Sequence, residues 1–382
     1  MVSILFHDAR KLDVDGEVDE FWMIANGDTI TATGSGRHPD VDDGTTRVDV
    51  AGRRLVPGFI DLHGHGGGGH SYDGDANEIR EGIAAHRAHG TTRTVVSLVT
   101  NPLDDLRRSL STVADLCSED PTILGSHLEG PFLSEARKGA HNPDHLRPPS
   151  AYELEELLGA SRGTLRQLTI APELAGAFEA IDVLVEASVV VAIGHSEADF
   201  DLAREAFDRG ARILTHAFNA MEGIHHRAPG PVVAAFEDDR VTLELVLDGH
   251  HVHPDVARMA FHSAPGRIAL VTDAMAAAGT SVDGGEYRVG SLDVTVRDGL
   301  AVLAGTTTIA GSTLTQDAAL RLAVSRAGIP ARDAVAALTS TPAKALGLDH
   351  RLGRLRAGFA ADAVILDHDL SVAAVWANGS PV

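Results

Sequence analysis

The chain of 382 residues is long enough for one large domain and a small one, and its 44% of hydrophobic residues allow a full buried core. A formal net charge of −22 and only 4% of aromatic residues argue against binding to nucleic acid or to anionic membranes, and no apolar run approaches the ~20 residues of a membrane span. The single cysteine, Cys117, which we expect to be structural, excludes an internal disulfide and a cysteine-based metal site. The N-terminus lacks the features of a signal peptide, so we expect a cytoplasmic protein.

The first part of the chain, residues 1–54, contains short β-like runs that Gly and Asp interrupt, and it shows no helical periodicity. From Leu55 onward, short apolar runs rich in Val, Ile and Thr alternate with mostly amphipathic segments. Eight runs occur, and they span residues 55–63, 91–100, 122–130, 165–173, 189–196, 211–219, 241–249 and 267–275. Apolar strands that alternate with helices indicate a parallel sheet covered on both faces. Eight such units predict an α/β fold, a (β/α)8 TIM barrel.

The pattern changes after the eighth run. Residues 286–305 are typical of a β-hairpin insertion, residues 313–346 return to helical patterns, and the tail is β-like again. Segments rich in β-structure therefore flank the barrel on both sides. We expect residues 1–54 and 346–382 to pair in one small β-sandwich domain, beside a barrel domain of residues 55–345.

Polar residues are concentrated at the C-terminal ends of the predicted strands. In a (β/α)8 barrel these ends converge on one mouth, so residues that are far apart in the sequence become neighbours. The residues found there are His63, His65, Glu129, Glu173, His195, His216, Asp248, His251 and Asp273. Imidazoles and carboxylates together suit a divalent transition metal such as zinc or iron.

The segment FIDLHGHGGGGH, residues 59–70, fits two different patterns. Its glycines match the G-x-G-x-x-G fingerprint of dinucleotide binding, but HSYDGD separates the last glycine from the next helix, and no acid ends the next strand. His63 and His65 instead form H-x-H, and side chains two positions apart on a strand point to the same side. We therefore favour a metal site that contains both residues, and we expect His70 to lie outside it.

The predicted ligands favour metal-assisted hydrolysis, because a bound ion lowers the pKa of its water from ~15.7 to about 7. Asp273, at the end of the last predicted strand, is placed to accept a proton from that water and to deliver it to a leaving group. Glu129 could bridge two ions. The ligands would then be His63, His65 and Asp273 on one side, and His195 and His216 on the other.

Several motifs carry a resemblance to a known family. PGFIDLHGHG is similar to the first-strand motif of the amidohydrolase superfamily. The motifs HLEGPF, KGAHNP, IGHS, THAFNAM, DGHHVHP, LVTDAM and IAGS resemble, in this order and across nearly the whole chain, those of N-acetylglucosamine-6-phosphate deacetylases. The resemblance implies a hydrolase that releases acetate from this sugar phosphate in amino-sugar catabolism. It also implies one or two divalent metal ions per subunit, with zinc expected first and iron, manganese or cobalt also compatible with the ligands.

The resemblance further assigns roles to individual residues. It implies Glu129, His195 and His216 as the core metal ligands, His63 and His65 as ligands of a second ion, and Asp273 as catalytic acid and base. It implies that His141 polarises the amide carbonyl, that Asn219, Ala220, Arg227 and His251 hold the phosphate, and that Ala310 and Gly311 line the acetyl pocket. The family is typically dimeric, and a neighbouring subunit can supply part of the phosphate site. Arg227 follows the sixth predicted strand in a loop flanked by Gly and Pro, where a cation can meet the mouth.

Three alternatives stay open at this stage. The same chemistry could act on another acetamido sugar phosphate, such as N-acetylgalactosamine 6-phosphate. A cyclic-amide hydrolase of the same superfamily is disfavoured because the fourth predicted strand has no lysine that could become a carboxylated metal bridge. A barrel that has lost catalysis and serves as a scaffold is disfavoured because the polar ligand set would be costly without an ion to bind.

A few polar residues have no firm assignment from the sequence. Glu173 either binds metal directly or orients groups beside it, and Asp61 is expected to support its neighbours from deeper in the barrel. His225, His226 and His250 are expected to be loop residues.

Overall fold

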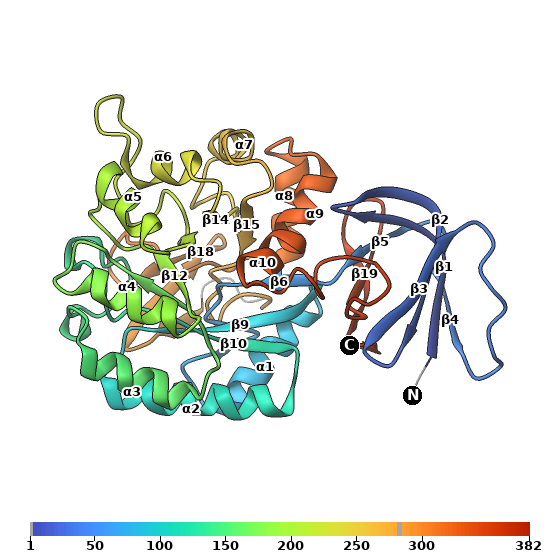
Figure 1. Ribbon diagram of the computed structural model, residues 1–382, viewed down its shortest axis with the longest axis horizontal. Helices are drawn as coiled ribbons and strands as arrows, with labels where there is room; N and C mark the ends of the chain where they lie inside the picture. The colour runs from blue at the N-terminus through green and yellow to red at the C-terminus, as the bar shows by residue number, and fades with distance from the viewer. Residues whose placement is uncertain (1–2, 281–284) are drawn as a thin grey trace.

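The computed structural model describes residues 3–280 and 285–382. Figure 1 shows a larger body, in which helices surround central strands, and a smaller body of strands that contains both ends of the chain. Among the described residues, none of the helices combines the length and the apolar character that crossing a bilayer requires.

Eight parallel strands form the centre of the larger body and follow one another in chain order. They are β6 (Phe59–Asp61), β9 (Thr91–Val99), β10 (Ile123–Glu129), β11 (Leu165–Ile170), β12 (Val190–Ile193), β13 (Ile213–Leu214), β14 (Thr242–Val246) and β15 (Ile268–Val271). Each strand lies within one of the eight predicted runs, so the predicted barrel is confirmed. β9 and β10 are buried along their whole length, which explains why these runs are apolar without alternation.

The first and last strands of the barrel meet just beyond their C-terminal ends. The backbone N–H of Asp273 donates to the carbonyl of His63 at 2.8 Å, and the N–H of His65 donates to the carbonyl of Ala274 at 2.7 Å. These bonds lie directly beside the predicted ligands. Closure of the barrel therefore also fixes the positions of the H-x-H pair and of Asp273 relative to each other.

Helices cover the outside of the barrel (Figure 1). They are α1 (Ala76–Arg87), α2 (Leu103–Glu119), α3 (Ala151–Ser161), α4 (Ala177–Glu186), α5 (Phe200–Asp208), α6 (Gly230–Glu237), α7 (Pro254–Ser263), α8 (Gln316–Ser325), α9 (Ala331–Leu338) and α10 (Ser340–Ala345). Short polar side chains begin several of them. Asp75 accepts hydrogen bonds from the first backbone N–H groups of α1, and Asp199 does the same for α5.

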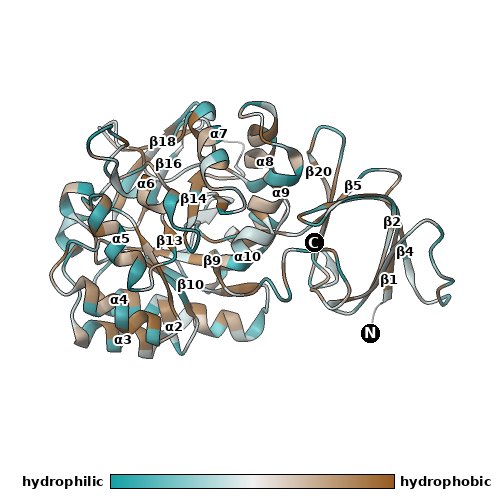
Figure 2. Cartoon of the chain, turned by 45° about the horizontal axis from the view of Figure 1, so that its top comes forward, coloured by the Kyte–Doolittle hydropathy of each residue, from teal (hydrophilic) through white to brown (hydrophobic). Residues whose placement is uncertain are grey.

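The smaller body draws its strands from both ends of the chain. They are β1 (Ser3–Asp13), β2 (Gly16–Asn26), β3 (Thr29–Ser35), β4 (Thr46–Asp49), β5 (Arg54–Pro57), β19 (Ala363–Leu366), β20 (Val372–Ala377) and β21 (Ser380–Pro381). All eight belong to one connected sheet, in which β5 joins β1 to β19. The sheet curves around a core of its own (Figure 2), which includes Phe6, Met23, Leu55 and Ile365. The exact division of the chain into domains stays a prediction.

A buried ion pair connects the two bodies. Arg93, on barrel strand β9, donates from Nε to Asp362 Oδ2 at 2.6 Å and from Nη2 to Asp362 Oδ1 at 3.1 Å. Asp362 directly precedes β19 of the terminal sheet. Both side chains are at most 8% exposed, so the pair is a desolvated, two-point contact between the bodies.

The predicted hairpin insertion contains three strands. They are β16 (Glu286–Val289), β17 (Leu292–Arg297) and β18 (Leu300–Leu303), which form an antiparallel sheet. Val289 and Leu303 of this sheet line the cavity at the mouth of the barrel. Two further short strands, β7 (Gly66–Gly67) and β8 (His70–Ser71), pair with each other after β6.

Candidate metal centre

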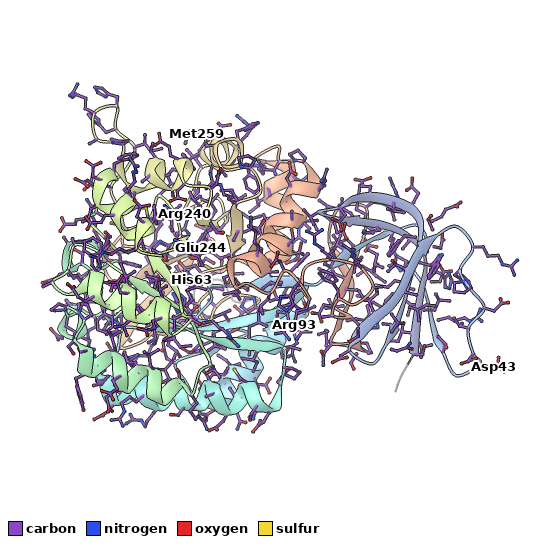
Figure 3. All side chains as sticks on the ribbon, viewed as in Figure 1. Asp43, His63, Arg93, Arg240, Glu244 and Met259 are labelled. Carbon is purple, nitrogen blue, oxygen red and sulfur yellow. The ribbon has the colours of Figure 1, made fainter. Side chains whose placement is uncertain are left out.

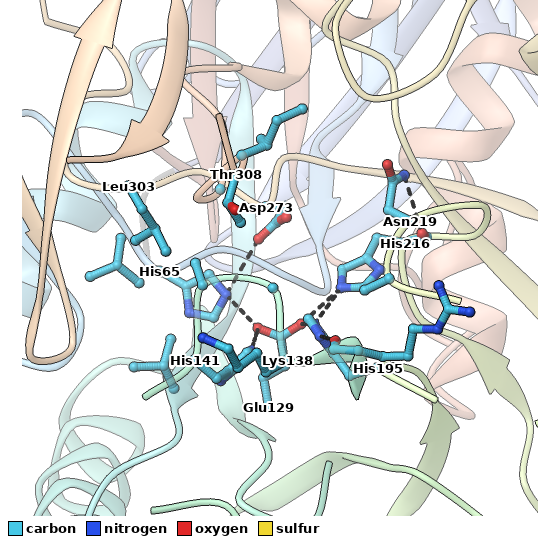
Figure 4. A pocket seen from close by; sticks show the side chains of 18 of the residues that line it. His65, Glu129, Lys138, His141, His195, His216, Asn219, Asp273, Leu303 and Thr308 are labelled. Carbon is cyan, nitrogen blue, oxygen red and sulfur yellow. Dashed lines mark hydrogen bonds and ion pairs between the residues drawn. The ribbon is translucent and has the colours of Figure 1, made fainter. Parts of the chain in front are cut away.

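A cavity of about 530 Å³ opens at the C-terminal ends of the barrel strands. Histidines and carboxylates form its floor, and residues of the loop after β10 and of the three-stranded insertion form its walls (Figure 4). The predicted site residues that line it are His65, Glu129, His141, His195, His216, Asn219, Ala220, His251, Asp273 and Gly311. His63 lies beneath them and is fully buried.

Glu129, the last residue of β10, lies at the centre of this group. Its Oε1 is 3.1 Å from Nε2 of His195 and 3.1 Å from Nε2 of His216. Its Oε2 is 3.1 Å from Nε2 of His65, and Oε1 is 3.4 Å from Nε2 of His63. One carboxylate thus contacts two pairs of imidazoles (Figure 4 shows three of the four rings), as expected of a residue that bridges two metal positions.

The imidazole nitrogens approach one another closely within each pair. Nε2 of His63 is 3.1 Å from Nε2 of His65, and Nε2 of His195 is 2.9 Å from Nε2 of His216. Two such nitrogens that both point lone pairs inward repel each other unless a proton or a cation lies between them. Nitrogen and carboxylate oxygen are donors that zinc, iron, manganese and cobalt accept, so this donor set fits a divalent metal.

Asp273 completes the first group of donors. Its Oδ1 is 3.6 Å from Nε2 of His63 and 3.4 Å from Nε2 of His65. The donor atoms of His63, His65, Glu129 and Asp273 all lie within 4.8 Å of one another. His63 and His65 follow β6, which ends at Asp61, so the extended strand itself ends before them.

The chain turns sharply at three of these residues. His195, His216 and Asp273 have positive φ angles of 48°, 26° and 47°, in the left-handed region that few residues other than glycine adopt. Each of them follows the end of a barrel strand, and the turn directs the side chain toward the mouth. Strained backbone of this kind is concentrated at functional sites, where the surrounding structure maintains it.

Burial and opposite charges set the protonation of the cluster. Burial alone would lower the pKa of His65, but the carboxylates of Asp273 and Glu129 raise it to about 9. Burial would raise the pKa of Glu129 and of Asp273, but the facing histidines, His63 first, hold both well below their usual range. The carboxylates are therefore ionised at neutral pH, and a metal ion would displace protons from the histidines when it binds.

His141 differs from the other histidines of the cavity. Burial, together with the nearby His195, lowers its pKa to about 4 despite a contact of 3.5 Å with Glu129, so its imidazole is neutral at neutral pH. Its Nδ1 lies 2.9 Å from Oγ1 of Thr100. The hydroxyl of Thr100 also lies 3.3 Å from the carbonyl of Glu129, to which it donates. In the tautomer of His141 that carries its proton on Nε2, that proton faces the cavity side of Glu129 and is available to a substrate oxygen.

The residues predicted to bind phosphate lie in two different places. Asn219, Ala220 and His251 line the cavity, and Asp248 holds His251 through a contact of 2.7 Å between Oδ2 and Nδ1. Burial opposes a rise in the pKa of His251, but Asp248 nevertheless raises it, which favours the cationic imidazolium.

Arg227 does not line the cavity of its own barrel. Mutual backbone hydrogen bonds between His225 and Ala228 make a tight turn at the end of this exposed loop, and Nη1 of Arg227 donates to His226 at 2.6 Å. The turn projects beyond α6 in Figure 1, and Arg227 is exposed. His225 and His226 are loop residues, as predicted.

Ala310 differs from its sequence-based assignment, whereas Glu173 has one of the two roles expected for it. Ala310 is fully buried and does not line the cavity, although Gly311 does. Glu173 accepts hydrogen bonds from the hydroxyl of Ser196 at 2.7 Å and from the N–H of Glu197 at 2.6 Å. It therefore orients the turn after His195, which is one of the two roles expected for it.

Asp61 connects the first and last barrel strands. The hydroxyl of Thr272 donates to Asp61 Oδ2 at 2.6 Å, and the N–H of Thr272 donates to Oδ1 at 3.2 Å. Asp61 therefore supports the segment that carries Asp273, as a residue deeper in the barrel was expected to do. His70 lies on β8 and does not line the cavity.

The sequence-based prediction missed two cations of the cavity. Arg137 and Lys138 line it from the turn η1 (Glu135–Arg137) and the residue after it. The carbonyl of Arg137 accepts a hydrogen bond from Nδ1 of His195 at 2.8 Å, and its guanidinium contacts Glu222. Both residues lie shortly before His141 in the sequence, and because the chain is strongly acidic, this pair of cations could have been recognised as candidate site residues.

The prediction also missed the residue behind His63. Glu244, in the middle of β14, contacts Nδ1 of His63 through Oε2 at 3.1 Å. It was overlooked because it lies inside an apolar run rather than at the end of a strand.

Fold and site together define a class of protein: a (β/α)8 barrel whose mouth holds a buried cluster of histidines and carboxylates suited to a divalent metal. The chain belongs to the Amidohydrolase family, which matches residues 54–382. Among its relatives, an N-acetylgalactosamine-6-phosphate deacetylase of Escherichia coli O157:H7 is 40% identical over 85% of this chain and 86% of its own length. The human N-acetylglucosamine-6-phosphate deacetylase is 37% identical over 88% of this chain and 85% of its own length.

Solved structures agree with these relatives. An N-acetyl-D-glucosamine-6-phosphate deacetylase from Mycobacterium smegmatis, solved as a mutant in complex with N-acetyl-D-glucosamine-6-phosphate, is 44% identical. The comparison covers 100% of this chain and 99% of that one, with a TM-score of 0.93. The N-acetylglucosamine-6-phosphate deacetylase of Thermotoga maritima is 30% identical with a TM-score of 0.88, and the match covers 99% of each chain.

Proposed function

We propose that this protein hydrolyses N-acetyl-D-glucosamine 6-phosphate to D-glucosamine 6-phosphate and acetate. The observation that carries the proposal is the position of Glu129 between two pairs of imidazoles, with Asp273 beside them in one cavity. The relatives supply the substrate, because enzymes named for this reaction match most or all of this chain at 37% to 44% identity.

The metal would be held by the predicted ligands. His195 and His216 with Glu129 would bind one ion, and His63 and His65 with Asp273 and the same Glu129 would bind a second. Zinc is our first choice, and iron, manganese or cobalt would also suit these donors. When bound, the ion supplies Lewis-acid polarisation and lowers the pKa of water at the site.

The chain's own residues would then position the substrate and move the protons. Asp273, ionised and only 8% exposed, accepts the proton of the attacking water as the water oxygen bonds to the amide carbon. His141 donates from Nε2 to the carbonyl oxygen, which acquires negative charge. Asp273 then returns the proton to the sugar nitrogen as the carbon–nitrogen bond breaks, which releases the amine and acetate.

The phosphate would be bound at the side of the cavity that contains Asn219, Ala220 and His251. The pKa of His251 is raised, so its imidazolium complements a phosphate dianion in an otherwise acidic protein. Because Arg227 is exposed and does not line its own cavity, we propose that the protein is a homodimer in which each Arg227 serves the neighbouring subunit. Location in the cytoplasm stays a prediction.

A second substrate is favoured by one specific observation. The relative that is 40% identical to this chain is named for N-acetylgalactosamine 6-phosphate, which differs from the glucosamine compound in the configuration at one hydroxyl. The test is acetate release from both sugar phosphates and from unphosphorylated N-acetylglucosamine, with the metal content measured on the same sample. The proposal requires that the glucosamine phosphate give the highest kcat/KM of the three.

A further inference from the structure

Glu244 is an acidic residue that is fully buried in the barrel wall. It lies in the middle of β14, and its side chain is 0% exposed. Figure 3 labels it beside His63 in the interior. Its Oε2 accepts from Nδ1 of His63 at 3.1 Å, and its Oε1 accepts from Nε2 of Gln167 at 2.8 Å. Within residues 3–280 and 285–382, neither lysine nor arginine forms an ion pair with it.

A carboxylate in this position lowers the stability of the folded state. Burying a charge destabilises the folded state unless a partner compensates it, and replacement of such groups by apolar residues is often neutral or stabilising. Among the residues that the structure describes, the only charged or chargeable partner of Glu244 is His63. The other nitrogen of His63, Nε2, faces Glu129 and Asp273 at 3.4 Å and 3.6 Å. Glu244 therefore acts on a ring whose opposite edge belongs to the metal cluster.

The contact determines which nitrogen of His63 can bind a metal. Because the carboxylate accepts at Nδ1, it keeps a proton on that nitrogen and leaves the lone pair on Nε2, directed at the cluster. Gln167 fixes the other oxygen of Glu244, so the carboxylate cannot rotate away. His65 has no equivalent support, since its Nδ1 is buried without a hydrogen-bond partner among the described residues.

Glu244 also contacts the second pair of candidate ligands through the backbone. The N–H of His216 points at Oε2 of Glu244 at 3.4 Å, and the N–H of Ala217 donates to the carbonyl of Glu244 at 2.8 Å. One residue of β14 thus holds ligands on both sides of Glu129. Of the two contacts that Oε2 makes, the one to His63 is the shorter, at 3.1 Å.

We propose that Glu244 is a positioning residue that makes the His63, His65, Glu129 and Asp273 group a competent metal position, so that the protein binds two ions rather than one. This inference rests on the proposed metal-dependent function. Outer carboxylates of this kind typically change metal affinity or activity ~10–100-fold when they are removed.

The test compares Glu244→Gln and Glu244→Ala with Thr242→Val, a matched control. Thr242 lies two residues earlier on β14 and is buried, and within the described part of the chain its side chain forms no hydrogen bond to a candidate ligand. Each protein is stripped of metal and titrated with Zn²⁺ against a chromophoric chelator, and the absorption spectrum is recorded with Co²⁺. Activity is measured over a range of free Zn²⁺ concentrations, so that kcat and KM are separated.

We expect Glu244→Ala to raise the dissociation constant of one of two ions by ~10–100-fold and to leave the other ion bound. Glu244→Gln still offers an oxygen to His63, so its dissociation constant should fall between those of wild type and Glu244→Ala. Excess Zn²⁺ should restore kcat while KM for the sugar phosphate stays constant. Thr242→Val should match wild type in both metal affinities and in the Co²⁺ spectrum.

Two results would overturn the inference: unchanged affinity for both ions in Glu244→Gln and Glu244→Ala, or equal weakening of both ions in all three variants. If Glu244→Ala does not fold, the metal affinities of Glu244→Gln are compared with those of wild type, and unchanged affinity for both ions would overturn the inference. Failure of the proposed function is a separate outcome. In that case wild type would release no acetate, while the metal titrations would still distinguish the Glu244 variants from the control.

Discussion

Replacement of Asp273 by asparagine removes a proton acceptor from the cavity and leaves an oxygen atom in nearly the same place. Oδ1 lies 3.4 Å and 3.6 Å from two imidazole nitrogens, and the side chain is almost buried, so little room exists for a substitute base. Loss of general acid–base catalysis typically lowers kcat by ~10²–10⁴-fold. That range corresponds to about 2.7–5.4 kcal/mol of transition-state stabilisation at 1.36 kcal/mol for each factor of ten.

The assay is steady-state acetate release with saturating metal, accompanied by metal analysis and a binding measurement with the sugar phosphate. Because the metal would keep its other ligands and the phosphate contacts are elsewhere, we expect KM to change by less than a factor of ~3 while kcat falls by the range above. Asp199→Asn is the matched control, since Asp199 caps α5 and does not line the cavity, and asparagine caps equally well. A kcat of Asp273→Asn within tenfold of wild type would refute the acid–base role.

Three further predictions test the fold and the electrostatics. Arg93→Ala leaves a buried carboxylate unpaired between the two bodies. Urea unfolding should therefore show that the free energy of unfolding falls by ~3–5 kcal/mol, while kcat of the folded protein stays within about twofold. An unchanged midpoint of urea unfolding would contradict this prediction. Gly311→Ala places a Cβ 2.9 Å from the carbonyl oxygen of Asp273 at a φ of +66°, so it should lower both stability and kcat. Gly328→Ala has a similar φ of +68°, but no atom lies near the new Cβ, so it should lower stability alone. In the metal-free protein, the unfolded chain protonates His141 near pH 6.5 and the folded chain only near pH 4, so stability should fall by up to about 3 kcal/mol as pH drops through this window. His141→Gln should lack that part of the pH dependence, and parallel stability curves would show that the pKa is not lowered.

The strands and the central residues of the histidine and carboxylate cluster could be predicted from the sequence because local patterns indicate them. Glu129, His195, His216 and Asp273 each stand where an apolar run ends, and in a parallel barrel all such ends meet. The strand ends meet in this way whatever the angles at which the strands cross. The prediction for His63 and His65 assumed that they continue the first strand, but β6 ends at Asp61, and backbone hydrogen bonds to the segment after β15 hold both residues at the mouth instead.

Other parts of the site depend on information that the local sequence does not carry. Glu244 contacts His63 only because the register of the barrel places the middle of β14 behind the end of β6, 181 positions away in the sequence. The direction of Arg227 depends on how the turn at His225 closes, and a loop flanked by Gly and Pro is compatible with either direction. The course of the loop after β10 decides in the same way whether Lys138 faces the cavity.

The most direct test of the account is acetate release from N-acetyl-D-glucosamine 6-phosphate by the protein with and without its metal. The account predicts one acetate and one glucosamine 6-phosphate per turnover in the metal-loaded protein, loss of turnover on chelation, and recovery when divalent metal is returned. It also predicts a higher kcat/KM for this substrate than for the galactosamine phosphate or the unphosphorylated sugar. Turnover that survives complete removal of metal, or no acetate from any of the three sugars by the metal-loaded protein, would contradict it.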